Sequence, residues 1–166
     1  MDKVSRKGWY DHKSNGFGIK YEIASNIKTG DIVHYHGPVR AAVHDLTLFQ
    51  GFLRKQLAPN ECVIADKGYI GDSKIITPRD ARNAQHKRAM AAVRMRHEHI
   101  NGRLKKWKAL GSIWRHALNK HHLVFRALLV ISQVEIENGR VLHTIEGYED
   151  PFGDAFDAVT EAIANL

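Results

Sequence analysis

The segment ECVIADKGY (61–69) decides the fold predicted for this chain, because it joins a short apolar run to an acid and a glycine-containing turn. Residues 61–66 are mostly apolar, as in strands that lie buried at the centre of a sheet. Asp66 stands at the carboxyl end of this run, which is the edge where open α/β sheets bind their ligands. An Asp before Lys-Gly is also a common way to begin a turn. The local pattern therefore leaves two interpretations of Asp66 open, a structural one and a functional one.

The residues before this segment predict a hairpin followed by a helix. Two strand-like runs, 19–27 and 31–37, are joined by a polar turn, and the Gly-Pro pair at 37–38 is expected to end the second strand. Leucine and phenylalanine then recur at helical spacing over 46–57, and Asp45 is the candidate N-cap of this helix.

A short strand and two longer helices are predicted after the segment. Residues 73–78 (SKIITP) indicate a strand, and 79–88 are polar and are expected to form a loop. Helical patterns follow over 89–108 and over 120–138, the second of which Gly139 is expected to stop. The order hairpin, helix, strand, helix, helix predicts an α/β fold, with a mixed sheet flanked by helices.

The first of these two helices carries one acid among many bases. Arg94, Glu98, Asn101 and Lys105 stand at positions i, i+4, i+7 and i+11, which lie on one helical face. One interpretation is a solvated face on which Arg94 and Glu98 form an i,i+4 ion pair. The excess of bases favours another, in which an anion such as phosphate neutralises the face.

Histidines supply a lesser alternative. His34 and His36 fall on one face of a strand, and His97 and His99 flank Glu98. Imidazoles in these positions could hold zinc, but no acid or cysteine spacing completes a zinc motif.

The charge of the chain is basic and unevenly distributed. There are 25 bases and 18 acids, a formal charge of +7 and a pI near 9.6. From Arg140 onward there are one base and six acids, so the remainder holds 24 bases and 12 acids, about +12. Such a body is expected to attract nucleic acid. The domain prediction is a catalytic-type domain over 1–140 and an acidic tail over 141–166, with a short strand and then a helix from Asp154.

Cys62 is the only cysteine, so neither an intrachain disulfide nor a cysteine-based zinc site is available. The longest apolar stretch, 123–134, is too short to cross a bilayer, and the first residues do not form a signal peptide. The chain is expected to be intracellular, soluble and without membrane partners. Its expected place is the nucleus of a eukaryote, or otherwise the cytoplasm.

These features together resemble a known family. ADKGY (65–69), followed by the spacing Arg94-x3-Glu98-x6-Lys105, resembles the signature of DDE transposases, and most of all that of the PIF/Harbinger and bacterial insertion-sequence-five groups. Three further segments are similar to the family in the same order: WYDHKSNGFGIKYE (9–22), GPVRAAVHDLTLF (37–49) and RHALNKHHLVFRALLVISQVEIENG (115–139).

The resemblance implies an RNase H-like fold and metal-dependent phosphoryl transfer on DNA. It implies that Asp66 and Glu98 are catalytic carboxylates that hold Mg²⁺ or Mn²⁺. Arg94, Lys105 and Asn101 are expected to contact DNA on the same helical face. The expected partners are double-stranded DNA at transposon ends, and either a second copy of the chain or a separate DNA-binding protein.

The sequence departs from the family pattern in two places. Position 91 is Ala where the signature has Tyr. The family's first acid ends a strand that precedes the segment at Trp9, and only eight residues stand there, with Asp2 as their one acid. Asp11 aligns with a small residue of the family and is a poor substitute. The expectation is therefore a fold that lacks its first strand and a chain with impaired activity.

Three hypotheses follow. The first is a metal-dependent DDE endonuclease or transposase. The second is a transposon-derived protein that has lost catalysis and binds DNA or another protein. The third is the product of a decayed element without a selected role. The missing first acid and Ala91 favour the second for this chain, whereas the retained Asp66, Arg94, Glu98 and Lys105 favour the first for its lineage. The prediction follows the lineage, a nuclease with impaired activity.

Overall fold

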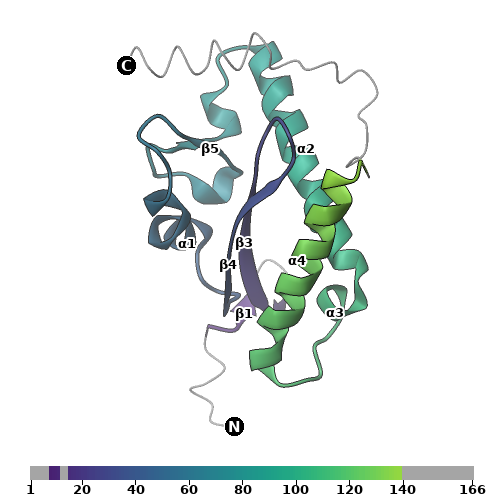
Figure 1. Cartoon of the computed structure of the whole chain (residues 1–166). Coiled ribbons are helices and arrows are strands. Elements are labelled where there is room, and N and C mark those ends of the chain that lie inside the picture. The colour runs from purple at the N-terminus through teal and green to yellow at the C-terminus, as the bar shows by residue number, and fades with distance from the viewer. Residues whose placement is uncertain (1–7, 12–14, 140–166) are drawn as a thin grey trace.

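The two longest strands form an antiparallel hairpin at the centre of the molecule (Figure 1). In the computed structural model, which describes residues 8–11 and 15–139, these strands are β3 (Ile19–Ser25) and β4 (Ile32–Arg40). The Asn26 side chain stabilises the turn between them, because its Oδ1 accepts hydrogen bonds from the backbone amides of Lys28 and Thr29. The predicted hairpin is therefore confirmed.

The Gly-Pro pair does not end the second strand as predicted. β4 continues through Gly37 and Pro38 to Arg40. Gly37 has φ +135°, and a Cβ there would lie 2.8 Å from the Lys20 carbonyl oxygen, so the close approach of β3 requires glycine. The register shifts at this point, between Lys20 and Glu22, and a proline without an N–H is tolerated at such an irregularity on an edge strand.

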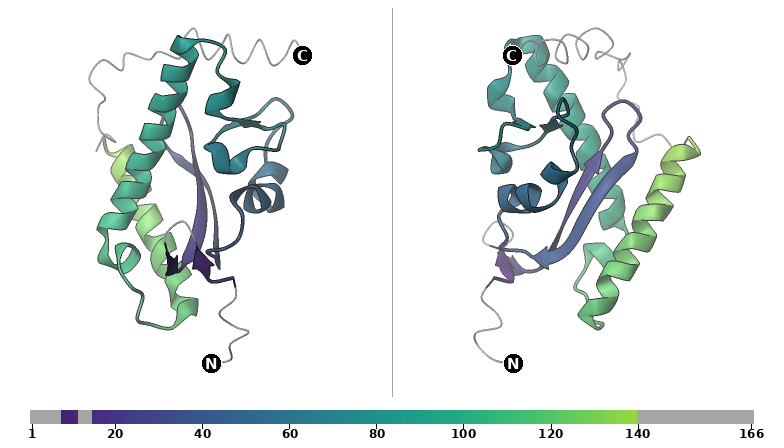
Figure 2. Two further views of the ribbon diagram at one scale, coloured as in Figure 1. Left: turned by 180° about the vertical axis from the view of Figure 1, so that it is seen from behind. Right: turned by 60° about the vertical axis from the view of Figure 1, so that its left-hand side comes forward.

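Two long helices cover one side of the hairpin (Figure 2). They are α2 (Ala84–Lys106) and α4 (His121–Glu137), and their inner faces share one apolar core. The Tyr21 ring of β3 stacks on Phe125 of α4, with ring centroids 3.6 Å apart. Buried members of this core are Ile100, Leu104, Phe125, Leu128 and Leu129.

Arg96 of α2 forms hydrogen bonds with the turn at the tip of the hairpin. Its guanidinium donates to the carbonyl oxygens of Ile27, Lys28 and Thr29 at 2.8, 3.0 and 3.2 Å. This contact fixes how far α2 lies from β3, and so fixes one wall of the space between them.

A second, smaller core lies on the other side of the hairpin. It joins α1 (Asp45–Gly51) and the 3₁₀ turn Leu53–Lys55 to a parallel pair of short strands, β5 (Val63–Ile64) and β6 (Ile75–Ile76). Its buried residues are Phe49, Leu53, Ala65 and Ile75. The two short strands predicted from 61–66 and 73–78 are therefore confirmed.

The remaining elements are short. The strand pair β1–β2 precedes β3, α3 follows α2, and 3₁₀ turns follow β5, follow β6 and precede α4. Their bounds are β1 Tyr10–Asp11, β2 Gly16–Phe17, α3 Lys108–Gly111, and 3₁₀ turns Lys67–Tyr69, Pro78–Asp80 and Leu118–Lys120.

Two helix boundaries differ from the predictions, because the residues that cap these helices are not the ones expected. His44, not Asp45, caps α1 by accepting from the Leu46 amide, and the helix ends at Gly51 instead of continuing to 57. The predicted loop 79–88 becomes helical at Ala84, because Asn83 caps α2 through the amide of His86. The last long helix agrees with its prediction to within one residue at each end.

The described residues confirm the α/β class but not one continuous sheet. Their strands pair as β1–β2, β3–β4 and β5–β6, three separate two-stranded sheets. The strand and helix predicted in 140–166 lie outside the described residues. In the part of the chain that the structure describes, no helix has the length and apolarity to span a membrane.

Candidate functional site

A large cavity lies between β3, β5 and α2. Its volume is about 1750 Å³, and it is lined continuously by residues 20–28 on one side and 60–66 on the other. Typical small-molecule pockets have volumes of roughly 300–1,000 Å³, so this space is larger than such a ligand requires. It brings together all five residues predicted from sequence as site residues: Asp66, Arg94, Glu98, Asn101 and Lys105.

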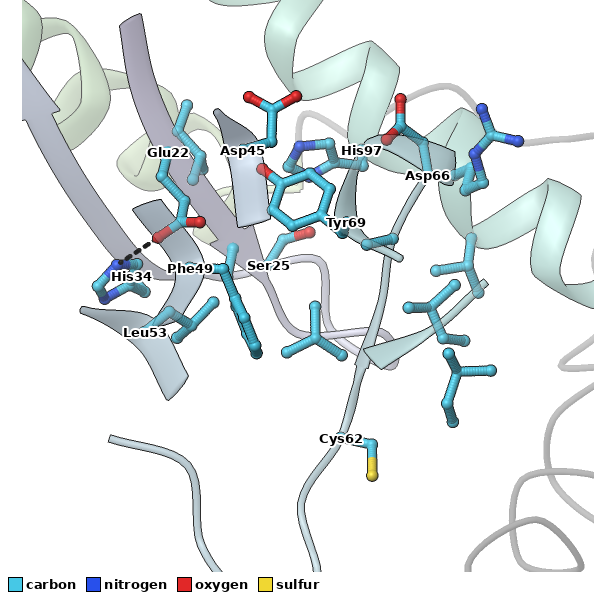
Figure 3. A pocket seen from close by; sticks show the side chains of 18 of the residues that line it. Glu22, Ser25, His34, Asp45, Phe49, Leu53, Cys62, Asp66, Tyr69 and His97 are labelled. Carbon is cyan, nitrogen blue, oxygen red and sulfur yellow. Dashed lines mark ion pairs between the residues drawn. The ribbon is translucent and has the colours of Figure 1, made fainter. Parts of the chain in front are cut away.

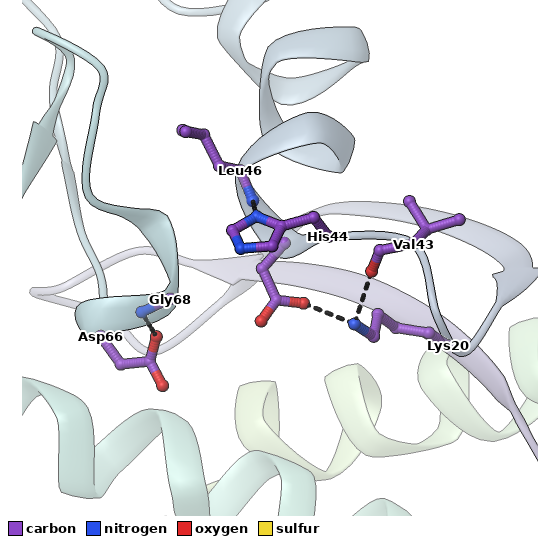
Figure 4. A network of polar contacts seen from close by, with 7 residues as sticks. Lys20, Val43, His44, Leu46, Asp66 and Gly68 are labelled. Atoms are coloured by element: carbon purple, nitrogen blue, oxygen red, sulfur yellow. Dashed lines mark hydrogen bonds and ion pairs between the residues drawn. The ribbon is translucent and has the colours of Figure 1, made fainter. Parts of the chain in front are cut away.

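Asp66 lies at the carboxyl end of β5, at the start of the turn Lys67–Tyr69. Its Oδ1 accepts the Gly68 amide at 2.7 Å (Figure 4). The turn interpretation of Asp66 is therefore confirmed. Among the described residues no hydrogen bond reaches its Oδ2, so the structural role leaves one carboxylate oxygen for another partner.

The α2 residues line the opposite wall of the cavity. Arg94, Glu98 and Lys105 are exposed and Asn101 is half-buried. Within the described residues no ion pair joins Arg94 to Glu98, so the i,i+4 pair considered from sequence does not form. Burial lowers the pKa of the neighbouring His97, and the charge of Glu98 opposes this shift in part. The Glu98 carboxylate and the flanking cations therefore face the open cavity.

Asp45 is a second carboxylate near Asp66 that the sequence did not assign to the site. Its Oδ1 forms an ion pair with Lys20 Nζ at 2.7 Å, and Lys20 also donates to the Val43 carbonyl oxygen. A Cβ placed on Gly68 would lie 3.0 Å from Asp66 Oδ1 and 3.1 Å from Asp45 Oδ2. The two oxygens are therefore no more than about 6.1 Å apart across the space that Gly68 leaves open.

Glu22 is a third carboxylate that lines the cavity, from β3. It is 4% exposed, and neither of its oxygens has a hydrogen-bond partner among the described residues. His34 is close to it, with Nε2 3.6 Å from Oε2, and burial lowers the pKa of this imidazole (Figure 3). Burial, with the charge of Asp45 as a smaller cause, raises the pKa of Glu22 to about 7.

The Tyr69 hydroxyl lies near all three acids, Asp45, Glu22 and Asp66. Burial, followed by the negative charges of Asp45, Glu22 and Asp66, raises the pKa of the Tyr69 hydroxyl. Figure 3 shows these four side chains in the cavity, with Tyr69 between Glu22 and Asp66. A single Glu inside the strand sequence IKYEIAS was a signal that could have pointed to this cavity. No sequence signal showed that residues 45 and 66 meet.

The histidines take other partners. His34 Nδ1 lies 3.1 Å from Gln56 Oε1, and the His36 ring stacks on Phe52. Over residues 8–11 and 15–139, no three His, Cys, Asp or Glu side chains are already gathered as a metal site. Nothing in this part of the chain supports the zinc alternative.

The comparisons with known proteins give one match. A family model described as DDE superfamily endonuclease matches residues 1–133. No curated protein and no solved structure matches the chain significantly.

Proposed function

The chain belongs to the DDE superfamily endonuclease family, and from that premise we propose that it is a metal-dependent nuclease of the transposase kind, with impaired activity. The family implies a DNA substrate and a nuclease or transposase type of function. The observation that supports the proposal most is that Asp66 and the Arg94, Glu98 and Lys105 face of α2 line one cavity.

The donor groups of the cavity fit a hard divalent cation. Members of the superfamily generally use divalent metals, and Mg²⁺ and Mn²⁺ prefer carboxylate oxygens, water and phosphate oxygens as ligands. Asp66 and Glu98 are the residues that we propose to hold the ion. Gly68 supports this assignment, because any side chain there would fill the space beside the Asp66 carboxylate. When bound, such an ion would activate the attacking oxygen and stabilise the leaving oxygen of an in-line displacement.

The cations of α2 have a separate role in the proposal. Arg94 and Lys105 are exposed on the cavity wall, where they can pair with phosphate oxygens and hold the DNA backbone beside the carboxylates. Asn101, on the same face, can donate to a phosphate or to a base edge. These contacts position the substrate and do not take part in bond making.

The arrangement of the strands supports an RNase H-like fold with one strand lacking. The cavity separates the free edges of β3 and β5, with Phe49 and Leu53 on one side and Met90 and Val93 on the other. A strand in this position would join the two small sheets into one mixed sheet between helix layers. Among the described residues no strand occupies it. The proposed impairment rests on this position, because the family's third acid ends such a strand.

The domain boundary and the partners remain part of the proposal. A domain over 1–140 agrees with the extent of the family match, and 141–166 would form an acidic tail. We propose that duplex DNA of transposon ends is the substrate, and that recognition of a sequence requires a second copy or a separate DNA-binding protein. The relatives expected are those of the PIF/Harbinger and insertion-sequence-five kind.

A second candidate function has its own support. A catalytically inactive, transposon-derived DNA- or protein-binding role is favoured by the absence, within the described residues, of a gathered metal site. This function predicts that the affinity for DNA is the same with and without Mn²⁺.

The test compares two neighbouring lysines in a DNA-binding titration. Lys105 lines the cavity and Lys106 does not. Lys105→Gln should weaken binding of a duplex oligonucleotide severalfold and reduce the salt slope by about 1, because one phosphate contact is lost. Lys106→Gln should change neither quantity. Equal effects of both variants would show that binding does not use the cavity. Nicking of supercoiled DNA in Mn²⁺ that Asp66→Asn removes would favour the nuclease over the inactive protein.

A further inference from the structure

The carboxylate of Asp45 faces the same space as that of Asp66. The two oxygens that approach this space, Asp45 Oδ2 and Asp66 Oδ1, come from elements far apart in sequence, the first turn of α1 and the end of β5. Each lies about 3 Å from the point where a Gly68 side chain would begin. Asp66 Oδ1 also accepts the Gly68 amide at 2.7 Å, so Asp66 Oδ2 and Asp45 Oδ2 are the oxygens of this pair that receive no hydrogen bond among the described residues. Two carboxylates so placed repel each other unless a cation stands between or beside them.

Lys20 satisfies only part of this requirement. Its ammonium pairs with Asp45 Oδ1, while Oδ2 of the same carboxylate faces Gly68. In the described residues no hydrogen bond reaches that second oxygen. The ion pair therefore orients Asp45 and leaves one oxygen directed at the Asp66 side.

Glu22 adds an independent observation. Its side chain is 2% exposed and its two oxygens lack hydrogen bonds, although it lines the same cavity. A buried carboxyl group without hydrogen bonds is costly to ionise unless a positive centre is close. His34 lies 3.6 Å away, but burial lowers its pKa and it is not a permanent cation, so a divalent ion in the cavity would favour the ionised form of Glu22.

We propose that Asp45 is a further metal-holding carboxylate, which acts with Asp66 and Glu98 on the divalent ion of this cavity. The inference rests on the proposed function, because it concerns the same ion. It gives the cavity three proposed acid ligands, Asp45, Asp66 and Glu98. Lys20 is then the counter-ion that holds Asp45 in place and competes with the metal for its charge. Gly68 keeps open the space in which the two aspartates approach each other.

The test separates a ligand from a merely structural acid. Mn²⁺ binding to the full chain is measured by calorimetric titration and by the loss of the free Mn²⁺ signal in electron paramagnetic resonance. Asp45→Asn should weaken Mn²⁺ binding by at least about tenfold. Lys20→Gln breaks the same ion pair but keeps the carboxylate, so it should leave Mn²⁺ binding unchanged or tighter. Urea unfolding of both variants shows what each costs in stability.

Gly68→Ala provides a variant that keeps both carboxylates and the Lys20 pair. The added methyl group should weaken Mn²⁺ binding by filling the space between Asp45 and Asp66.

Each outcome decides something. If Asp45→Asn and Lys20→Gln change Mn²⁺ binding alike, Asp45 has a structural role and the inference is wrong. If Asp66→Asn abolishes binding while Asp45→Asn leaves it intact, the inference fails and the proposed function stands. If the unaltered chain does not bind Mn²⁺, or Asp66→Asn binds it as well as the unaltered chain, both fail.

Discussion

At the scale of single residues, Glu22 is a carboxyl group whose pKa is far above its ordinary value. Its carboxyl is buried beside His34 and near Asp45, and its pKa is raised from 4.5 to about 7. Between these two values the folded chain keeps a proton that the unfolded chain releases. The contribution of Glu22 to stability is therefore fully present below pH 4.5 and is lost as the pH rises through 7.

Glu22→Gln should remove this dependence. Relative to the unaltered chain, the variant should gain up to about 3 kcal/mol of unfolding free energy between pH 5 and pH 8, measured by urea denaturation in a chelating buffer. His34 lies 3.6 Å from Glu22 and its pKa is lowered by burial, so the double variant with His34→Gln serves as the control for its own titration. A gain that does not depend on pH would mean that Glu22 is not protonated in the folded chain.

The sequence was sufficient to predict which residues line the site, but not which of them contact one another. Asp66, Glu98, Arg94 and Lys105 were named from spacing and from a family resemblance, and the structure places them on one cavity. Asp45 was predicted only as a cap, because its approach to Asp66 depends on how α1 packs against β5. That packing is a tertiary property, which no local pattern encodes.

At the scale of elements, the position of α2 depends on Arg96. Three carbonyl oxygens at the tip of the hairpin receive its N–H groups, and α2 carries Arg94, Glu98 and Lys105. Loss of the guanidinium would leave the half-buried Ile27 carbonyl group without this partner, would expose those of Lys28 and Thr29 to water, and would free the helix from the hairpin tip.

Arg96→Ala should lower the free energy of unfolding by about 2–3 kcal/mol, as measured by urea denaturation. Lys87→Ala, an exposed change on the same helix, is the matched control and should alter it by less than about 0.5 kcal/mol. Similar losses in the two variants would contradict the anchoring role of Arg96.

Element boundaries were predictable wherever local chemistry decided them. The hairpin followed from its alternation and its turn residues, and α4 from its period and from Gly139. Gly37 and Pro38 were expected to end β4, yet the strand continues, because the register shift against β3 accommodates both residues. Such a shift is a property of the strand pair and cannot be read from one strand.

At the scale of the whole molecule, charge separates the body from the last residues. Residues before 140 carry a formal charge of about +12, and those from Arg140 onward carry six acids and one base. A polyanion should therefore be attracted by the body and repelled by the remainder.

Removal of residues 140–166 should strengthen binding to nonspecific duplex DNA severalfold at low salt, measured by fluorescence anisotropy over a salt series. Replacing the six acids by their amides in the full-length chain should have the same effect, because charge and not length is the cause. Unchanged affinity in both variants would mean that the acidic residues do not oppose DNA binding.

The α/β class was predictable from the order of elements, whereas the division into three small sheets was not. β5 and β6 lie beside each other but not beside β3, and the cavity occupies the space between. The four strands β3 to β6 were predicted and the two-residue strands β1 and β2 were not, because so short a run carries no alternation. Which strands pair depends on tertiary packing.

The central claim is that Asp66 and Glu98 hold a divalent ion in this cavity, and the most direct measurement is the melting temperature with and without Mn²⁺. The full chain should melt at a higher temperature in Mn²⁺, because an ion that binds only the folded state stabilises it. Asp66→Asn keeps the acceptor for the Gly68 amide but lacks the charge, and it should abolish the rise. Glu98→Gln should do the same. Glu61→Gln, which alters an exposed acid at the opposite end of the same cavity, should preserve it. A rise that survives in Asp66→Asn and Glu98→Gln would contradict the assignment of these two carboxylates.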